Sequence, residues 1–206
     1  FSIQFEDKTG DQQLANQTCY GISERCIAAL ISMHGDDKGL ILPPAVAPVQ
    51  VVIIPITIGK RHDDVLGAAQ KLEADLKAAG IRVKMDTRDL RPGAKYFWWE
   101  LRGVPLRLEL GPRDLDAGKV MAVKRTGQKS QMELGAVCEG VVRLLADITD
   151  TIRELAGEYT RSHLCSVDSV DALNSALNEE KVAVAHWCRE RECGDAIEER
   201  ANSSIL

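Results

Sequence analysis

Three groups of residues in this chain have types and spacings that could do chemistry, and the first is a glycine followed four positions later by an arginine. Gly21 and Arg25 lie in the stretch QTCYGISER. An arginine guanidinium is planar and permanently charged, so it can lie against a nucleotide base and also bind phosphate. Glycine lets a ligand come close to the backbone. This spacing alone is also typical of an exposed helix start, so both interpretations stay open.

The second group is the basic and aromatic stretch 91–115, which reads RPGAKYFWWELRGVPLRLELGPRDL. RNA bases that splay out of a loop need hydrogen-bonding partners for their edges and flat side chains on which to stack. Arginine suits a guanine edge, and carboxylates accept from the guanine amino and imino hydrogens. At least two of the four aromatic residues 96–99 are expected in the core, and residues 103–105 are expected to form a turn.

The third group is the cysteine pair Cys188 and Cys193, separated by four residues. Two thiolates about one helical turn apart are enough for half of a tetrahedral zinc site. The spacing does not single out His186 or Cys165 as a further ligand, so chance remains an alternative to zinc. The other cysteines are scattered and are expected to behave as small apolar residues rather than as a disulfide framework.

Other common chemical signatures are absent from the sequence. It contains no phosphate-binding P-loop, Rossmann glycine pattern, Ser–His–Asp order or H-E-x-x-H. The neighbouring acids at 36–37 and at 179–180 do not converge on one reacting group, and we interpret both pairs as solvated.

The elements that must position these residues fall into three predicted units: 1–45, 46–157 and 158–206. The first has strands over 2–6 and 13–23, then a helix over 24–33. A proline-rich stretch, 43–48, marks a boundary. The second alternates strands (49–55, 81–85, 106–110, 119–124) with helices (63–79, 94–102, 133–157), which predicts an α/β fold with a parallel or mixed sheet. The third has helices over 167–177 and 195–200 around a strand over 181–186.

The composition is that of a globular chain with an uneven charge. The net charge is −5, yet residues 82–129 hold twelve Lys and Arg against six Asp and Glu. A basic centre in an acidic chain is compatible with phosphate contact, and equally with an ordinary solvated surface. No apolar run approaches the ~20 residues of a membrane helix, and no signal peptide is evident, so we expect a cytoplasmic location and no membrane partner. The start at Phe1, without Met, is expected of a fragment.

The continuation of the first motif makes a family resemblance specific. The helix led by Arg25, the sequence HGDDKGLILPP at 34–44 and the strand VQVVIIPI at 49–56 together resemble prolyl-tRNA synthetases of the archaeal and eukaryotic type. The resemblance identifies motif 3 of a class II aminoacyl-tRNA synthetase. It implies that Ser23 and Arg25 bind ATP and that Cys19 and Gly21 lie in the amino-acid pocket. Many relatives have Ser-Trp-Gly where this chain has Cys-Tyr-Gly, which leaves the details of that pocket open.

The resemblance extends to the second group. It implies that residues 46–157 are an anticodon-binding domain and that the anticodon readers are Glu100, Arg107, Arg113 and Asp114. A proline anticodon contains two guanines, which suits a mixture of arginine and carboxylate. Asp114 could instead cap a local turn. Many relatives have a C-terminal zinc domain with a similar cysteine pair, so Cys188 and Cys193 are candidate zinc ligands, although the second cysteine pair of those relatives is missing here.

The fold implied is the end of an antiparallel class II catalytic domain, then an α/β anticodon-binding domain with a mixed sheet, then a small α+β domain. The activity implied is ATP- and Mg²⁺-dependent ligation of proline to its tRNA through a prolyl-adenylate, by a protein that is a homodimer when intact. The fragment alone is expected to be inactive. The alternative is a non-catalytic RNA-binding accessory module, which would not need Arg25. A threonyl, histidyl or glycyl synthetase is disfavoured by the 34–44 stretch and by WELRGVPLR.

Overall fold

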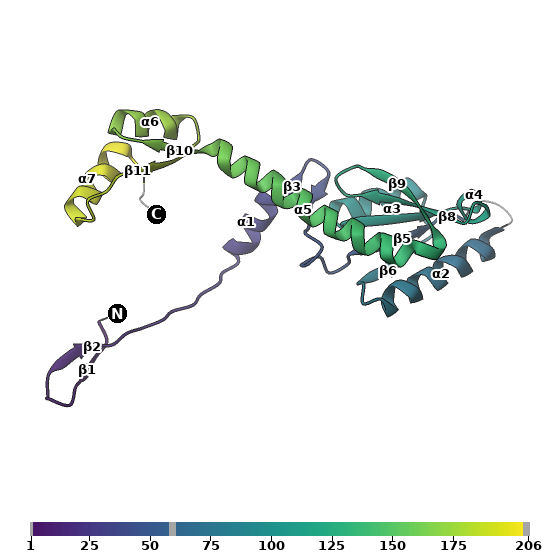
Figure 1. The fold of residues 1–206 in the computed structure, drawn as a ribbon, viewed down its shortest axis with the longest axis horizontal. Coiled ribbons are helices and arrows are strands. Elements are labelled where there is room, and N and C mark those ends of the chain that lie inside the picture. The colour runs from purple at the N-terminus through teal and green to yellow at the C-terminus, as the bar shows by residue number, and fades with distance from the viewer. Residues whose placement is uncertain (1, 58–60, 204–206) are drawn as a thin grey trace.

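The computed structural model describes residues 2–57 and 61–203, and its largest sheet is a five-stranded mixed sheet (Figure 1). The strand order is β6-β5-β7-β8-β9. The first three of these strands run parallel to one another, and β8 and β9 each run antiparallel to the strand before them. The strands are β5 (Val51–Pro55), β6 (Val83–Met85), β7 (Leu106–Leu110), β8 (Lys119–Lys124) and β9 (Lys129–Glu133). The predicted α/β class with a mixed sheet is confirmed.

The burial pattern of each strand depends on whether one or both of its faces are packed. All five residues of β5 are buried, as expected of a central strand with both faces packed. In β7, the leucines at 106, 108 and 110 are fully buried, whereas Arg107 and Glu109 are half-buried. Because side chains alternate between the two faces of a strand, Arg107 and Glu109 lie together on the face opposite the leucines.

Two helices cover one face of the sheet and a third covers the other. α2 (His62–Ala78) and α5 (Val137–His163) pack their apolar positions onto the face that contains the β7 leucines. α3 (Pro92–Leu101) packs Trp99 against Val52, Ile54 and Val104 on the opposite face. Helix α3 therefore lies on the same side of the sheet as Arg107 and Glu109. A short helix, α4 (Pro112–Asp116), follows β7 directly and was not predicted.

A buried carboxylate fastens α3 to the edge of the sheet. Asp86, just after β6, is 2% exposed. It accepts a hydrogen bond from the Trp99 indole at 2.7 Å and bonds from Arg88 Nε and Nη2 at 2.9 and 2.6 Å. Its main-chain oxygen accepts from the buried Lys95 ammonium at 3.1 Å. The buried polar atoms are thus paired, as stability requires.

The N-terminal part is extended and largely solvated. β1 (Gln4–Glu6) and β2 (Gln12–Leu14) form a hairpin at the far end of a long irregular segment (Figure 1). The predicted strand over 13–23 is wrong beyond Leu14. The Ala15 amide still donates to the Ile3 carbonyl at 2.8 Å, but no strand of the described chain lies beside residues 16–23 to take up their backbone hydrogen bonds. α1 (Arg25–Met33) follows and buries no residue, and β3 (Gly35–Asp36) with β4 (Gly39–Leu40) forms a second small hairpin.

Helix α5 leads to a small C-terminal unit (Figure 1). There β10 (Leu164–Val167) and β11 (Val182–Ala185) pair in parallel, joined by α6 (Val170–Asn178) and followed by α7 (Arg191–Ala201). Strands β9 and β10 were not predicted. Since α5 continues through residue 157, the predicted boundary there falls inside a helix, and the domain limits stay a prediction. None of the described helices is both long and apolar enough to cross a bilayer.

Candidate nucleic-acid interface

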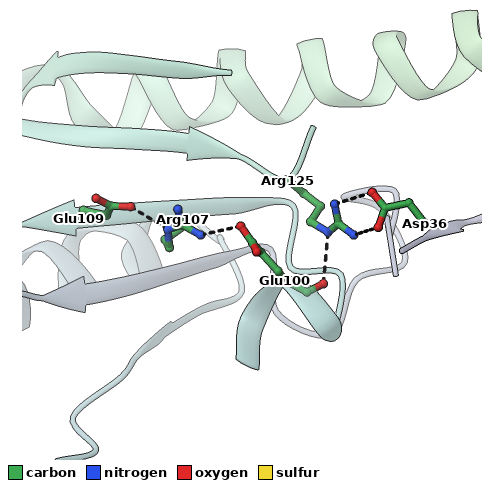
Figure 2. A network of polar contacts seen from close by, with 5 residues as sticks. All are labelled: Asp36, Glu100, Arg107, Glu109 and Arg125. Atoms are coloured by element: carbon green, nitrogen blue, oxygen red, sulfur yellow. Dashed lines mark hydrogen bonds and ion pairs between the residues drawn. The ribbon is translucent and has the colours of Figure 1, made fainter. Parts of the chain in front are cut away.

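The centre of the candidate site is Arg107, which is held between two carboxylates. Its Nη1 donates to Glu100 Oε1 at 3.2 Å, and its Nε donates to Glu109 Oε1 at 2.8 Å (Figure 2). The Arg107 side chain is 11% exposed. Two elements build this arrangement: β7 supplies Arg107 and Glu109, and the last turn of α3 supplies Glu100. The structure therefore brings together two of the predicted anticodon readers.

The ring of Tyr96 packs against the guanidinium of Arg107. The guanidinium carbon of Arg107 lies 4.0 Å from the centre of the Tyr96 ring, a cation–π contact. Burial and then the negative charge of Glu109 raise the pKa of Tyr96 to about 12. The hydroxyl therefore stays protonated at neutral pH. The contacts with Tyr96 and the two acids fix the guanidinium in one orientation, and the bonds to the acids use two of its five N–H donors.

The other two predicted anticodon readers lie in α4. Asp114 accepts a hydrogen bond from the Gly111 amide at 2.9 Å and so caps this helix. The capping alternative raised from the sequence is thus observed for Asp114, although it does not exclude a contact with RNA. The Arg113 side chain is exposed and pairs with none of the described residues. Arg113 and Asp114 follow β7 closely, but neither is bonded to Arg107.

The aromatic run on α3 divides between core and surface. Trp99 is buried and Tyr96 packs against the same cluster, whereas Phe97 and Trp98 are exposed. The Arg102 guanidinium lies 3.4 Å from the Trp98 ring centre, and that of Arg88 lies 4.6 Å from it. The expectation that two of the four aromatic residues belong to the core agrees with this arrangement.

The residues predicted to bind ATP and proline are not gathered into a site in the described chain. Residues 16–30 are all exposed, including Cys19 and Gly21 in the irregular segment and Ser23 and Arg25 at the start of α1. The prediction that Arg25 starts a helix is confirmed, but this helix buries no residue of its own. The role of Arg25 in binding nucleotide stays a prediction.

The cysteine pair does not complete a metal site. The pKa of the Cys188 thiol is lowered, first by the Glu190 backbone amide and then by a hydrogen bond with Cys193, so the two thiols lie close together. Within residues 2–57 and 61–203, no group of three or more His, Cys, Asp or Glu side chains could hold a metal ion. A tetrahedral zinc site needs four ligands, so these residues do not fit zinc.

Sequence reasoning missed Glu109, Asp36 and Arg125. The alternation in LRLEL could have placed Glu109 beside Arg107. Asp36 was interpreted as solvated, and its side chain is indeed exposed, but the prediction missed its partner: Arg125 Nη1 and Nη2 donate to its two carboxylate oxygens at 3.0 and 2.5 Å. No local signal could have identified this pair, because the partners lie 89 positions apart. Figure 2 shows the row from Glu109 to Asp36.

Comparisons with known proteins agree with the sequence resemblance. Residues 50–144 match the family model described as an anticodon binding domain. The whole chain is 69% identical to a proline–tRNA ligase of Methanoregula boonei and 55% identical to one of Methanocorpusculum labreanum, and it spans 43% of each. It also matches the crystal structure of a prolyl-tRNA synthetase from Cryptosporidium parvum complexed with L-proline and AMP. That match has a TM-score of 0.86 and 36% identity, and covers 97% of this chain and 43% of the other.

Proposed function

We infer that this chain, which matches the C-terminal portion of prolyl-tRNA synthetases along its full length, supplies the anticodon-reading part of a proline–tRNA ligase. The observation that carries this proposal is the Glu100–Arg107–Glu109 cluster, which lies within the stretch that matches an anticodon binding domain. The partner is a proline tRNA, whose anticodon contains two guanines.

The chemistry of the cluster suits the exposed edge of guanine. That edge presents one acceptor, O6, and two donor groups, N1–H and the 2-amino group. An arginine donates to O6, and a carboxylate accepts from N1–H and from the amino group. Adenine places an acceptor at N1, which would face a carboxylate oxygen without a hydrogen between them. One guanidinium flanked by two carboxylates therefore favours guanine over adenine.

Arg113 and Asp114 complete the proposed reader from α4. The exposed Arg113 guanidinium is free to meet a phosphate of the anticodon loop, and Asp114 adds a further acceptor near Tyr96. An arginine can bind in a bidentate way, which a lysine cannot do. Both residues stay proposals that RNA-binding measurements must test.

For the whole protein we propose two steps: the proline carboxylate displaces pyrophosphate from the α-phosphate of ATP to form a prolyl-adenylate, and a terminal ribose hydroxyl of the tRNA then displaces AMP. In this scheme Arg25 lies against the adenine and holds phosphate, Ser23 contacts the nucleotide, and Cys19 and Gly21 line the proline pocket. Mg²⁺, when bound, would neutralise charge on the phosphates during attack of the proline carboxylate at the α-phosphate. The relative from C. parvum was crystallised with proline and AMP, which supports this assignment.

The remaining expectations concern the intact protein. We propose a homodimer located in the cytoplasm. Zinc is not part of the proposal, because Cys188 and Cys193 have no further ligand among the described residues. A non-catalytic RNA-binding module is not favoured, since the relatives that match the whole chain are proline–tRNA ligases.

The test is binding of the chain to the anticodon stem-loop of a proline tRNA, compared with a stem-loop whose two guanines are adenines. Salt must be fixed, because phosphate contacts make affinity strongly salt-dependent. We expect the wild type to prefer guanine by roughly 1–3 kcal/mol for each base read, and Arg107→Ala to lose that preference. The matched control is Arg153→Ala, an arginine that is 73% exposed in a surface ion pair on α5. Equal binding of the two stem-loops by the wild type would refute the proposal.

A further inference from the structure

Arg125, at the end of β8, is a buried guanidinium that none of the roles above uses. Its side chain is 3% exposed. Nη1 and Nη2 bind the two carboxylate oxygens of Asp36, Nη2 also donates to the Gly39 carbonyl at 3.1 Å, and Nε donates to the Glu100 carbonyl at 3.2 Å. One side chain therefore joins the β3–β4 hairpin to the last turn of α3 (Figure 2).

The backbones at this junction are packed as closely as glycines allow. A Cβ on Gly39 would lie 2.4 Å from Leu101 Cα, and a Cβ on Gly103 would lie 2.7 Å from Leu40 Cβ. The Leu42 amide also donates to the Gly103 carbonyl at 3.3 Å. The hairpin is thus seated directly on the residues that follow Glu100, and Arg125 lies between the two.

We propose that Arg125 is a positioning residue for guanine selection, an inference that rests on the proposed function. It holds the main chain of Glu100 from one side, while the Glu100 carboxylate meets Arg107 on the other. Asp36 fixes the plane of the Arg125 guanidinium through two parallel bonds. A shift of this last turn of α3 would move the Glu100 carboxylate away from the guanine edge without changing any group that touches RNA.

The geometry requires arginine rather than positive charge alone. The planar fork donates to Asp36, Gly39 and Glu100 at once, whereas a lysine ammonium is a point charge that cannot reproduce the bidentate pair. The Glu100 carbonyl at this helix end also accepts from the Gly103 amide at 3.0 Å, so Arg125 adds a second donor to a group that carries partial negative charge. Arg125 therefore both caps α3 and sets its position.

The experiment compares the guanine preference of four versions of the chain: wild type, Arg125→Lys, Asp36→Asn and the control Arg153→Ala. The readout is the ratio of affinities for the natural anticodon stem-loop and for the adenine-substituted one, at fixed salt. Circular dichroism defines the temperature range in which each variant is folded. Asp36→Asn is the milder change, because Asp36 is 40% exposed and asparagine keeps one acceptor oxygen.

We expect the wild-type preference, on the order of tenfold, to fall by about threefold or more in Arg125→Lys and Asp36→Asn, with Arg153→Ala unchanged. Affinity for the adenine-substituted stem-loop should stay the same, because phosphate contacts are unaffected. A merely structural role would lower the melting temperature and leave the ratio intact, and that result would overturn the inference alone. A wild-type ratio of one would overturn the anticodon proposal and this inference with it.

Discussion

The central sheet domain and the N-terminal segment each carry residues of a family motif, yet they present them in opposite ways. Arg107 is nearly buried and is held by two carboxylates and an aromatic ring. Arg25 stands at the start of a helix that buries no residue of its own. The same residue type is therefore prearranged in one region and solvated in the other. The difference indicates that the described chain builds the proposed RNA-reading site by itself, but not the proposed nucleotide site.

The largest expected contrast between the two regions is in stability. Leu108 is fully buried in the sheet core, whereas Ile27 in α1 is 62% exposed. Leu108→Ala should lower the free energy of unfolding by about 2–5 kcal/mol, through lost burial and a cavity. Ile27→Ala should change it by less than about 0.5 kcal/mol. Urea denaturation followed by tryptophan fluorescence measures both changes. A large loss in Ile27→Ala would break the comparison, because α1 would then belong to the folded core.

The junction between the two regions can be tested with a pair of glycines. Gly39 and Gly118 both have positive φ, but only at Gly39 would a Cβ collide with neighbouring backbone. Gly118→Ala should cost about 1 kcal/mol from backbone strain alone. Gly39→Ala should cost about 3 kcal/mol, because the hairpin must also move off α3. If thermal denaturation shows equal losses of stability in the two variants, the β3–β4 hairpin does not pack on α3.

The fold could be predicted where the signal is local. The apolar run 49–55 and the periodicity of 63–79 predicted β5 and α2 within two residues. The strand over 13–23 could not be judged, because an extended pattern becomes a strand only beside a partner. Strand β9 is mostly exposed and polar, so it carries no apolar alternation. It is a strand because β8 pairs with it.

The candidate site follows the same rule. Glu100 and Arg107 were predicted from the resemblance, and their contact is observed. The Asp36–Arg125 pair could not be predicted, because it depends on tertiary packing between distant segments. The role of Asp86 was also not predicted: Arg88 is only two positions away, but Trp99 meets Asp86 only once α3 packs on the sheet.

The buried carboxylate of Asp86 should make stability depend on pH more strongly than a solvated carboxylate does. Burial raises the pKa of Asp86, but hydrogen bonds from Arg88 and Trp99 outweigh it and bring the pKa to about 2. Because the folded pKa lies below the unfolded one, Asp86 stabilises the fold above about pH 4, and this contribution is lost as the pH falls towards 2. It is on the order of 2 kcal/mol.

The variant Asp86→Asn should therefore be less stable than wild type at pH 7, and the difference should shrink towards pH 2. Denaturation curves between pH 2 and 7 measure this change. Asp150→Asn is the control, since its ion pair with Arg153 is exposed and is worth little. A pH-independent difference for Asp86→Asn would contradict the account of this carboxylate.

The smallest expected effect separates charge from base reading within the central domain. Arg113 is exposed, so Arg113→Ala should weaken binding of the two stem-loops by similar amounts, and should reduce the slope of log affinity against log salt by about 1. Arg107→Ala should change the guanine preference and leave that slope nearly unaltered. Affinity titrations at several salt concentrations measure both. If both variants change the guanine preference and the salt slope by the same amounts, Arg107 has no special role in reading guanine.

The most direct test of the central claim replaces each anticodon guanine by inosine, which lacks only the 2-amino group. We predict that the wild-type chain binds the inosine stem-loop several-fold more weakly, because a carboxylate loses a donor. In Glu100→Gln this difference should largely disappear, since the amide is a weaker acceptor and can present its amino group instead. Equal binding of guanine and inosine by the wild type, or an undiminished difference in Glu100→Gln, would contradict the claim that the Glu100–Arg107–Glu109 cluster reads guanine.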